Sequence, residues 1–306
     1  MSARAETDRH LEAANATTAR WNPRIDARRT VGRIWQWLFF SATAIAIVIL
    51  GMLLWSLVQS GWSWLSWHLI LDMPSRTPEM AGMNSAIWGS IWIVIGSAAF
   101  SFVVGVGTAI FIEEYAPRNR FTRFVETNIS NLAGVPSIVY GLLGLALFVQ
   151  WFNMGRSISA GALTMGLLIL PVVVISSQES IRAVPLGLRQ ASYGLGATKW
   201  QTVRSHVLPT AMPGILTGMI LSMSRAIGET APLLVVGASS LVLTRPDGPF
   251  SGFTAMPVQI YNWSARPQRE FENLTAASII VLMIILLSMN AFAIILRQRL
   301  SKKNRM

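Results

Sequence analysis

The sequence contains no cysteine, which excludes disulfide bonds, thiolate catalysis and cysteine-ligated metal sites. Charged residues are also scarce, because aspartate, glutamate, lysine and arginine together make up only 13% of the chain. Hydrophobic residues make up 52%, and the mean hydropathy is +0.48. A composition so poor in charge and so rich in apolar residues indicates an integral membrane protein and not a soluble globular domain.

The chain also lacks a Walker A sequence, a recognisable Ser–His pairing, and a cluster of His, Asp and Glu with metal-ligand spacing. ATPases, hydrolases and metalloenzymes each need one of these arrangements. The sequence therefore argues against an intramembrane enzyme. It predicts a chain with no catalytic residue, cofactor or metal of its own.

Six apolar segments are each close to the roughly 20 residues that cross a bilayer as a helix. They cover residues 34–58, 84–112, 129–151, 158–177, 212–236 and 275–296. We expect an all-α transmembrane domain over residues 34–300. A basic N-terminal tail over residues 1–33, expected to be largely disordered, precedes it, and a short C-terminal tail over residues 301–306 follows.

Lysine and arginine are distributed unevenly between the segments. Nineteen of the 25 basic residues lie in the two tails and in the second and fourth connections, whereas five lie in the other three connections. Basic residues are retained on the cytoplasmic side of a membrane. This alternation predicts that both termini and the connection after the fourth segment are cytoplasmic.

That fourth connection, about residues 179–211, reads as two short helices joined at a glycine. Pro185 suits the first turn of a helix, and Gly196 ends it. Thr198 can cap a second helix, which Leu208-Pro209 is expected to end. Two amphipathic helices held between membrane spans form a compact knob that a cytoplasmic partner can grip.

The fifth segment carries charge at membrane depth. Gly214, Gly218, Ser222, Arg225 and Glu229 follow one another at helical spacing, so we expect them on one face of a helix that points into a bundle. Two interpretations stay open. Arg225 and Glu229 neutralise each other and fasten the bundle, or Arg225 lines a translocation path and offers two parallel hydrogen bonds to a tetrahedral oxyanion. Thr230 adds a hydroxyl beside them.

The third segment contains the run Gly134-Val-Pro-Ser-Ile-Val-Tyr-Gly141. Pro136 disrupts helical hydrogen bonding, and the glycines allow neighbouring helices to approach closely. Ser137 is a candidate lining residue of a polar path, although a serine in a helix more often bonds its own backbone.

The knob resembles the coupling loop of ABC importer permeases. The matching positions are Gln190, Ala191, Ser192, Gly196, Leu208 and Pro209. The family's pattern has glutamate where this chain has Gln190 and isoleucine where it has His206. In that family the loop docks into a groove on a cytoplasmic ATPase, so the resemblance implies a type I importer permease.

Three further runs narrow the resemblance to the PstA permeases of the bacterial phosphate importer. They are Gly134–Gly141, Arg182-Ala-Val-Pro185 and Arg225-Ala-Ile-Gly-Glu-Thr-Ala-Pro-Leu233. The resemblance implies a pathway role for Arg225 and Glu229, and for Arg182 as a further basic residue. It also implies residence in the bacterial cytoplasmic (inner) membrane and transport by alternating access.

The same resemblance implies a PstC-like second permease, two PstB-like ATPase subunits that hold ATP and Mg²⁺, and a PstS-like phosphate-binding protein. Other possibilities stay open at this point. The substrate could be another oxyanion such as sulfate or molybdate, the second permease could be another copy of this chain, or the chain could be a self-sufficient channel or secondary transporter.

Overall fold

A computed structural model describes residues 24–238, 242 and 244–303. Every regular element over these residues is helical. The chain divides into two compact units, Met1–Ser56 and Leu57–Met306. The described part of the first unit belongs to helix α2 (Arg24–Gly61), which contains the first predicted span. Residues 24–33 are helical, which differs from the largely disordered tail expected there, and residues 1–23 of that tail lie outside the described part.

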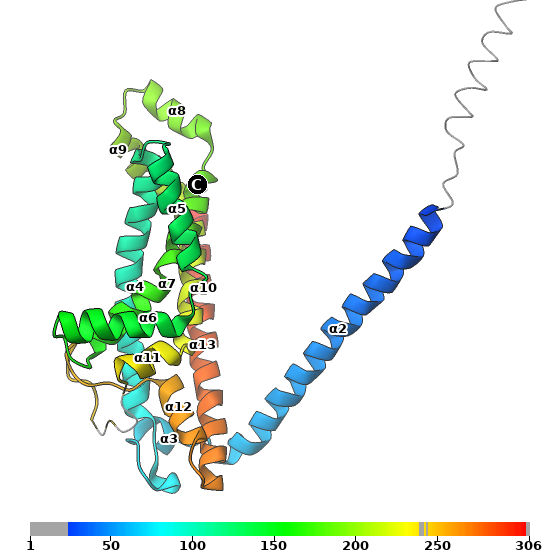
Figure 1. Cartoon of the computed structure of the whole chain (residues 1–306), viewed down its shortest axis with the longest axis vertical. Coiled ribbons are helices and arrows are strands. Elements are labelled where there is room, and N and C mark those ends of the chain that lie inside the picture. The colour runs from blue at the N-terminus through cyan, green and yellow to red at the C-terminus, as the bar shows by residue number, and fades with distance from the viewer. Residues whose placement is uncertain (1–23, 239–241, 243, 304–306) are drawn as a thin grey trace, which may run out of the picture. The chain divides into compact units, whose positions relative to one another are not determined.

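The second unit holds the remaining spans. Its long helices are α4 (Asn84–Ile110), α7 (Ile158–Arg182), α10 (Leu208–Gly228) and α13 (Arg269–Lys303). Shorter helices are α3 (Trp67–Leu71), α5 (Arg120–Leu132), α6 (Ser137–Gly144), α8 (Leu186–Gly194), α9 (Lys199–Thr202), α11 (Ala231–Val236) and α12 (Met256–Ser264). Figure 1 shows α8 and α9 at one end of this unit and α3 and α12 toward the other.

The described residues hold six candidate spans when a bent pair is counted as one, and two of the predicted spans are interrupted. Five helices are long and apolar enough to cross a membrane, and a bent pair makes a sixth. That pair is α5 with the stretch Ser137–Trp151, and the two parts meet at 104°. The third span is therefore broken and not a single helix over residues 129–151. Pro136 precedes α6 in an extended conformation and cannot donate a backbone hydrogen bond, which explains the break.

The packing centre of this unit is α7, which lies against both α4 and α10. Two-thirds of its most apolar 18-residue window is buried, more than in any other span of the described residues. Small residues allow the close approach. A side chain at Gly105 of α4 would overlap Val173, and one at Gly214 or Gly218 of α10 would overlap Ser180 or Ser176. The predicted small-residue face of the fifth span is thus in contact with α7.

The long connection before the last span contains a packed helix. Its helix α12 packs on α4 and α13. Phe253, Met256 and Trp263 are fully buried, and the Met256 amide donates to Ser90 Oγ at 2.8 Å. The prolines and glycines of this connection favour irregular structure, so its sequence does not indicate a packed helix. The C-terminal helix α13 runs to Lys303, so the predicted tail is helical over residues 301–303, and residues 304–306 are outside the described part.

The coupling knob has the predicted helix–glycine–helix form with one correction. Gly196 has φ +82°, the left-handed conformation that favours glycine. Thr198 and Gln201 form a reciprocal capping box at the start of α9. Leu208-Pro209 does not end this helix, however. A π-helical turn, η5 (Val203–Val207), joins α9 to α10, and Pro209 lies in the first turn of α10, where a missing N–H is tolerated.

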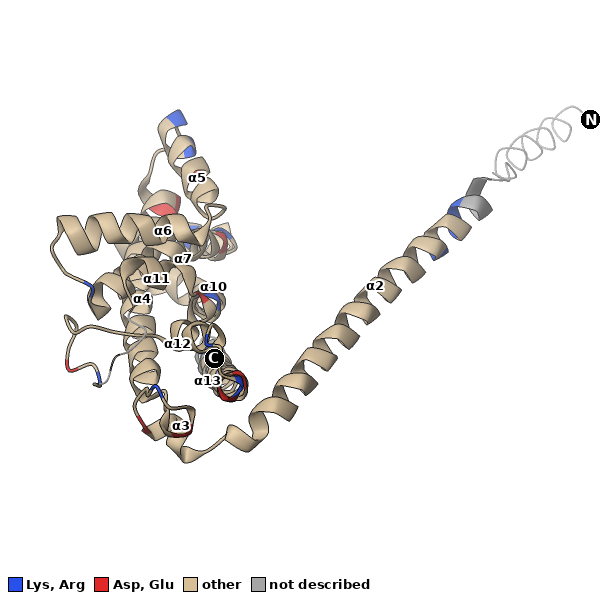
Figure 2. Ribbon diagram, turned by 60° about the horizontal axis from the view of Figure 1, so that its bottom comes forward, with Lys and Arg blue, Asp and Glu red and all other residues tan. Residues whose placement is uncertain are grey.

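Charge is rare along the spans. Figure 2 shows the long helices almost entirely in the colour of uncharged residues, with charged positions gathered near helix ends. In the fifth span, Arg225 lies in the last turn of α10, and this helix ends inside the predicted span 212–236. The site is built around this residue.

Candidate functional site

Arg225 lies near the middle of the membrane-spanning unit. Gly214 meets Ser180 and Gly218 meets Ser176, so α10 and α7 run antiparallel. Arg225 is about 10 Å further along α10 than Gly218, at the usual rise per residue. That distance brings it level with Ile169, close to the midpoint of the 25-residue α7. The neighbouring Ala226 belongs to the same buried cluster as Ile169.

The fifth span breaks at this depth. Helix α10 ends at Gly228, and Glu229 is extended, with φ −77° and ψ 125°. The chain then restarts as α11 after Thr230. The prediction that Glu229 lies on the same helix face as Arg225 is therefore wrong, because the carboxylate is just beyond the helix end. Irregular backbone at membrane depth is tolerated where it is packed in protein or lines a wet cavity.

The two charges nevertheless pair. Arg225 Nε lies 3.5 Å from Glu229 Oε1, a longer separation than a good charge-assisted hydrogen bond. The Arg225 side chain is 58% exposed, against 20% for Glu229. Arg225 was predicted to point into a bundle. In this single chain most of its side chain is exposed, although Gly214 and Gly218 of the same helix pack on α7.

The break in the fifth span lies beside the bend in the third. Gly141 of α6 packs directly on Pro232 of α11, and the Tyr140 hydroxyl donates to the Leu132 carbonyl across the bend at 2.8 Å. Ser137 is partly buried in the first turn of α6, one turn before Gly141. Thr230 is also partly buried, at the start of α11. Two interrupted spans thus meet near the depth of Arg225.

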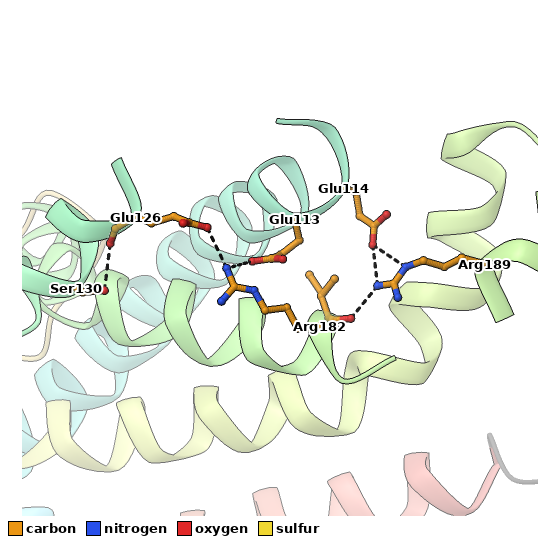
Figure 3. Close-up of polar contacts among 7 residues, drawn as sticks. Glu113, Glu114, Glu126, Ser130, Arg182 and Arg189 are labelled. Carbon is orange, nitrogen blue, oxygen red and sulfur yellow. Dashed lines mark hydrogen bonds and ion pairs between the residues drawn. The ribbon is translucent and has the colours of Figure 1, made fainter. Parts of the chain in front are cut away.

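Arg182 is not part of this arrangement. It ends α7, about 20 Å along the helix from the level of Arg225. Its Nη2 lies 2.7 Å from Glu113 Oε1 and 2.9 Å from Glu126 Oε1. Figure 3 shows Arg182 between these two carboxylates. The structure places Arg182 with the coupling end of the molecule and does not bring it to Arg225.

The predicted coupling residues divide into packed and exposed positions. Ser192 is buried and shares a 2.8 Å hydrogen bond with Thr202, which joins α8 to α9. Gln190 and Ala191 are exposed. Leu195, which directly follows α8, is 90% exposed at the tip of the knob. Leu208 and Pro209 are partly buried where α10 begins. The knob therefore offers its first helix and its tip to a partner.

Sequence reasoning missed the acidic partners. It counted basic residues only, whereas Glu113, Glu114 and Glu126 hold Arg182 and Arg189 in ion pairs. A signal was available, since two consecutive glutamates follow directly on the second apolar segment. The contact between Asn290 of α13 and Ser224 of α10, a hydrogen bond of 2.5 Å, could not be predicted from the sequence either. This contact involves the residue that precedes Arg225.

Comparisons with known proteins identify the family and the fold of the chain. The family described as binding-protein-dependent transport system inner membrane component matches residues 101–305. The chain belongs to this family of ABC transporter permeases. The permease is 32% identical over 286 residues to the phosphate transport system permease protein PstA 1 of Mycobacterium tuberculosis, with 91% of each chain covered. It is 30% identical to PstA of Haemophilus influenzae, covering 89% of this chain and 95% of that one.

A third relative is the probable ABC transporter permease protein YqgI of Bacillus subtilis, 37% identical over 63% of this chain and 65% of that one. Solved structures support the fold. A permease chain of a bacterial ABC transporter involved in alginate import has a TM-score of 0.61 at 16% identity, covering 87% of this chain and 99% of that one. The MetNI methionine transporter in an inward-facing conformation gives a TM-score of 0.57 at 16% identity, covering 70% of this chain and 94% of that one. The fold is that of type I importer permeases, and the permease is a transport subunit, with ATPase activity in partner subunits of the transporter.

Proposed function

We propose that the permease forms part of an ATP-driven importer that carries inorganic phosphate across the cytoplasmic membrane. One observation carries the proposal: an exposed arginine lies at mid-membrane depth, where the fifth span breaks, in a chain whose relatives include phosphate transport permeases. An ionised side chain at this depth is costly unless it has a partner or a wet cavity. The 3.5 Å contact with Glu229 only partly supplies such a partner.

The chemistry of arginine suits phosphate. The guanidinium stays charged at any physiological pH, and its planar fork donates two parallel hydrogen bonds to neighbouring oxygens of a tetrahedral anion. Glu229 positions the fork and opposes the charge of the anion, so binding stays weak. Weak binding is required, because a transported ion must leave the site again. Thr230 and Ser137 supply neutral hydroxyls along the same path.

The exposed side of α10 at Arg225 needs a polar neighbour in the membrane, which a second subunit can supply. We assign this place to a PstC-like permease, so that the path runs between the two chains with Arg225 on its wall. Two PstB-like ATPases bind the knobs formed by α8 and α9 and hold ATP and Mg²⁺. A PstS-like protein delivers phosphate from outside. The charge asymmetry of the sequence supports a cytoplasmic position for the knob and both termini.

Transport then follows alternating access. ATP binding closes the two ATPases and draws the knobs together, which opens the spans outward. Phosphate passes Arg225, and hydrolysis returns the complex to the inward-open state. In this scheme α10 is the direct mechanical connection, because α9, η5 and α10 form one continuous helix from the knob to Arg225.

The test is uptake of labelled phosphate by cells that lack their own importer and express the permease with its partners. An ATPase-dead partner and excess unlabelled sulfate serve as controls. We expect ATP-dependent uptake that sulfate does not inhibit. Inhibition by sulfate or molybdate would transfer the proposal to another oxyanion, and uptake without a working ATPase would overturn the importer mechanism.

A further inference from the structure

The helical turn at the end of α4 carries two consecutive carboxylates that bind arginines on either side of the connection between α7 and α8. Glu113 and Glu114 lie on the π-helical turn η3 (Phe111–Tyr115). Glu113 pairs with Arg182, the last residue of α7, and Glu114 pairs with Arg189 of α8. Between these arginines the chain leaves α7 and enters the coupling knob through residues 183–185. Figure 3 shows the two ion pairs side by side.

Arg189 is more completely bonded than an ordinary surface arginine. Its Nε and Nη2 donate to Glu114 Oε1 at 3.2 and 3.0 Å. Its Nη1 donates to the Val184 carbonyl at 2.7 Å, and Nη2 also donates to the Ile181 carbonyl at 2.9 Å. The Ile181 carbonyl belongs to the last turn of α7 and also accepts the Val184 amide, and Val184 lies two residues beyond the end of that helix. One side chain of α8 therefore holds both α4 and α7.

Both partners are withdrawn from solvent. The side chain of Arg189 is 15% exposed and that of Glu114 is 7% exposed. A charge pair in such surroundings is screened little, and loss of one member leaves the other uncompensated. Exposed ion pairs are much weaker and reorganise easily. The Glu114–Arg189 pair is therefore strong enough to transmit a movement of α8 to α4.

The remaining contacts make the knob move as one piece. The Ser192–Thr202 hydrogen bond ties α8 to α9 inside the knob. The tip turns at Gly196 in a left-handed conformation. Displacement of the knob is thus passed along two routes, through the continuous α9–α10 helix to Arg225 and through Arg189 to α4 and α7.

We propose that Glu114 and Arg189 are positioning residues that couple ATP hydrolysis to transport, by joining the first coupling helix rigidly to the second and fourth spans. This inference rests on the proposed importer function. Without the joint, the knob still binds the ATPases and the fifth span still follows it. The other two spans lag behind, so hydrolysis proceeds without a complete change of access.

The first arm of the test measures transport and hydrolysis together, in proteoliposomes that contain the whole complex and trapped ATP. The variants are Glu114→Gln, which keeps the shape and removes the charge, and Arg189→Lys, which keeps the charge and removes the fork. Glu79→Gln and Arg269→Lys are the matched controls, since both residues are exposed and distant from the joint in sequence. Copurification of the partners verifies assembly.

We expect Glu114→Gln and Arg189→Lys to lower the number of ions imported per ATP hydrolysed by about tenfold, with hydrolysis within about twofold of wild type, as for loss of one buried charge-assisted contact. The controls keep the wild-type ratio. A proportional fall of uptake and hydrolysis, or an unchanged ratio in both variants, would overturn the proposal.

The second arm does not depend on the transported ion. Because the chain has no cysteine, Gly107→Cys on α4 and Gly187→Cys on α8 introduce the only two thiols for spin labels. An added side chain at either position meets nothing within 4 Å. We expect a narrow distance distribution in the wild-type background that broadens with Glu114→Gln. If phosphate uptake fails in the wild type while this broadening occurs, the phosphate assignment falls and the joint stands. An equally narrow distribution in both backgrounds removes the joint.

Discussion

Two arginines of this permease differ in their exposure and in their hydrogen bonding. Arg189 at the coupling end is 15% exposed and makes four hydrogen bonds to three acceptors. Arg225 at mid-membrane depth is 58% exposed, and its contact with Glu229 is 3.5 Å long. The residue at the coupling end is thus the more enclosed one, the reverse of what membrane depth alone would lead one to expect.

The difference separates two tasks. A side chain that transmits movement has to keep the same partners throughout the cycle, so its donors are satisfied within the chain. A side chain that meets a passing anion has to exchange partners, so its donors must remain accessible and its resident partner must be displaceable. Arg189 fits the first description and Arg225 the second. The predictions that follow test this division, from the largest expected effect to the smallest.

Replacing Arg225 removes the only charged donor that the fifth span offers. We expect Arg225→Ala to lower the rate of phosphate uptake by about 100-fold, the value of one or two charge-assisted hydrogen bonds. Uptake of labelled phosphate and copurification of the partners are measured on the same preparations. Arg225→Lys keeps the charge without the fork and should lose less. Wild-type uptake by an assembled Arg225→Ala complex would remove Arg225 from the path and leave it as a partner of Glu229 only.

Gly218 lies about two turns before Arg225 on α10 and packs closely on α7, so a methyl group there should be costly. A Cβ at Gly218 would overlap the Ser176 side chain, so we expect Gly218→Ala to destabilise the permease by about 1–3 kcal/mol, as overpacking does. The thermal midpoint of the purified complex reports this. Gly107→Ala is the control, because a side chain there meets open space. Equal midpoints for the two variants would mean that α7 and α10 are less closely packed than described.

Glu229 should tune binding and not enable it. In Glu229→Gln the charge that opposes the anion is lost, so phosphate binds Arg225 more tightly and leaves more slowly. We expect the concentration for half-maximal uptake and the maximal rate both to fall, each by about fivefold to tenfold, from the loss of one long ion pair. A dose series of labelled phosphate separates the two parameters. A loss of rate with weaker apparent binding would instead assign Glu229 a purely structural role.

Much of this fold could be predicted from the sequence. Hydrophobic segments of adequate length predicted the spans, since the bilayer fixes the length of a crossing helix. Gly196 and Thr198 predicted the turn and cap of the knob, because left-handed backbone and an unsatisfied helix N-terminus restrict the residue type. Each of these predictions depends only on residues that are close together in the sequence.

The features that depend on long-range packing could not be predicted from the sequence. Helical periodicity placed Glu229 on the face of Arg225, yet α10 ends before it and the chain turns to pack α11 on α6. The exposure of Arg225 depends on which face α7 occupies, and the pairing of Arg189 with Glu114 joins residues 75 positions apart. A single sequence contains no direct signal for such contacts.

The smallest effect is expected where one arginine has two carboxylates. Arg182 is 56% exposed and keeps the close contact with Glu113 when Glu126 is neutralised. Exposed ion pairs contribute about 0–1 kcal/mol, so Glu126→Gln should leave uptake and the number of ions per ATP within about twofold of wild type. The same proteoliposome assay measures both. A loss as large as that from Glu114→Gln would show that the Arg182 pairs also carry the coupling movement, and the joint would then extend through Glu126 to α5 and the broken third span.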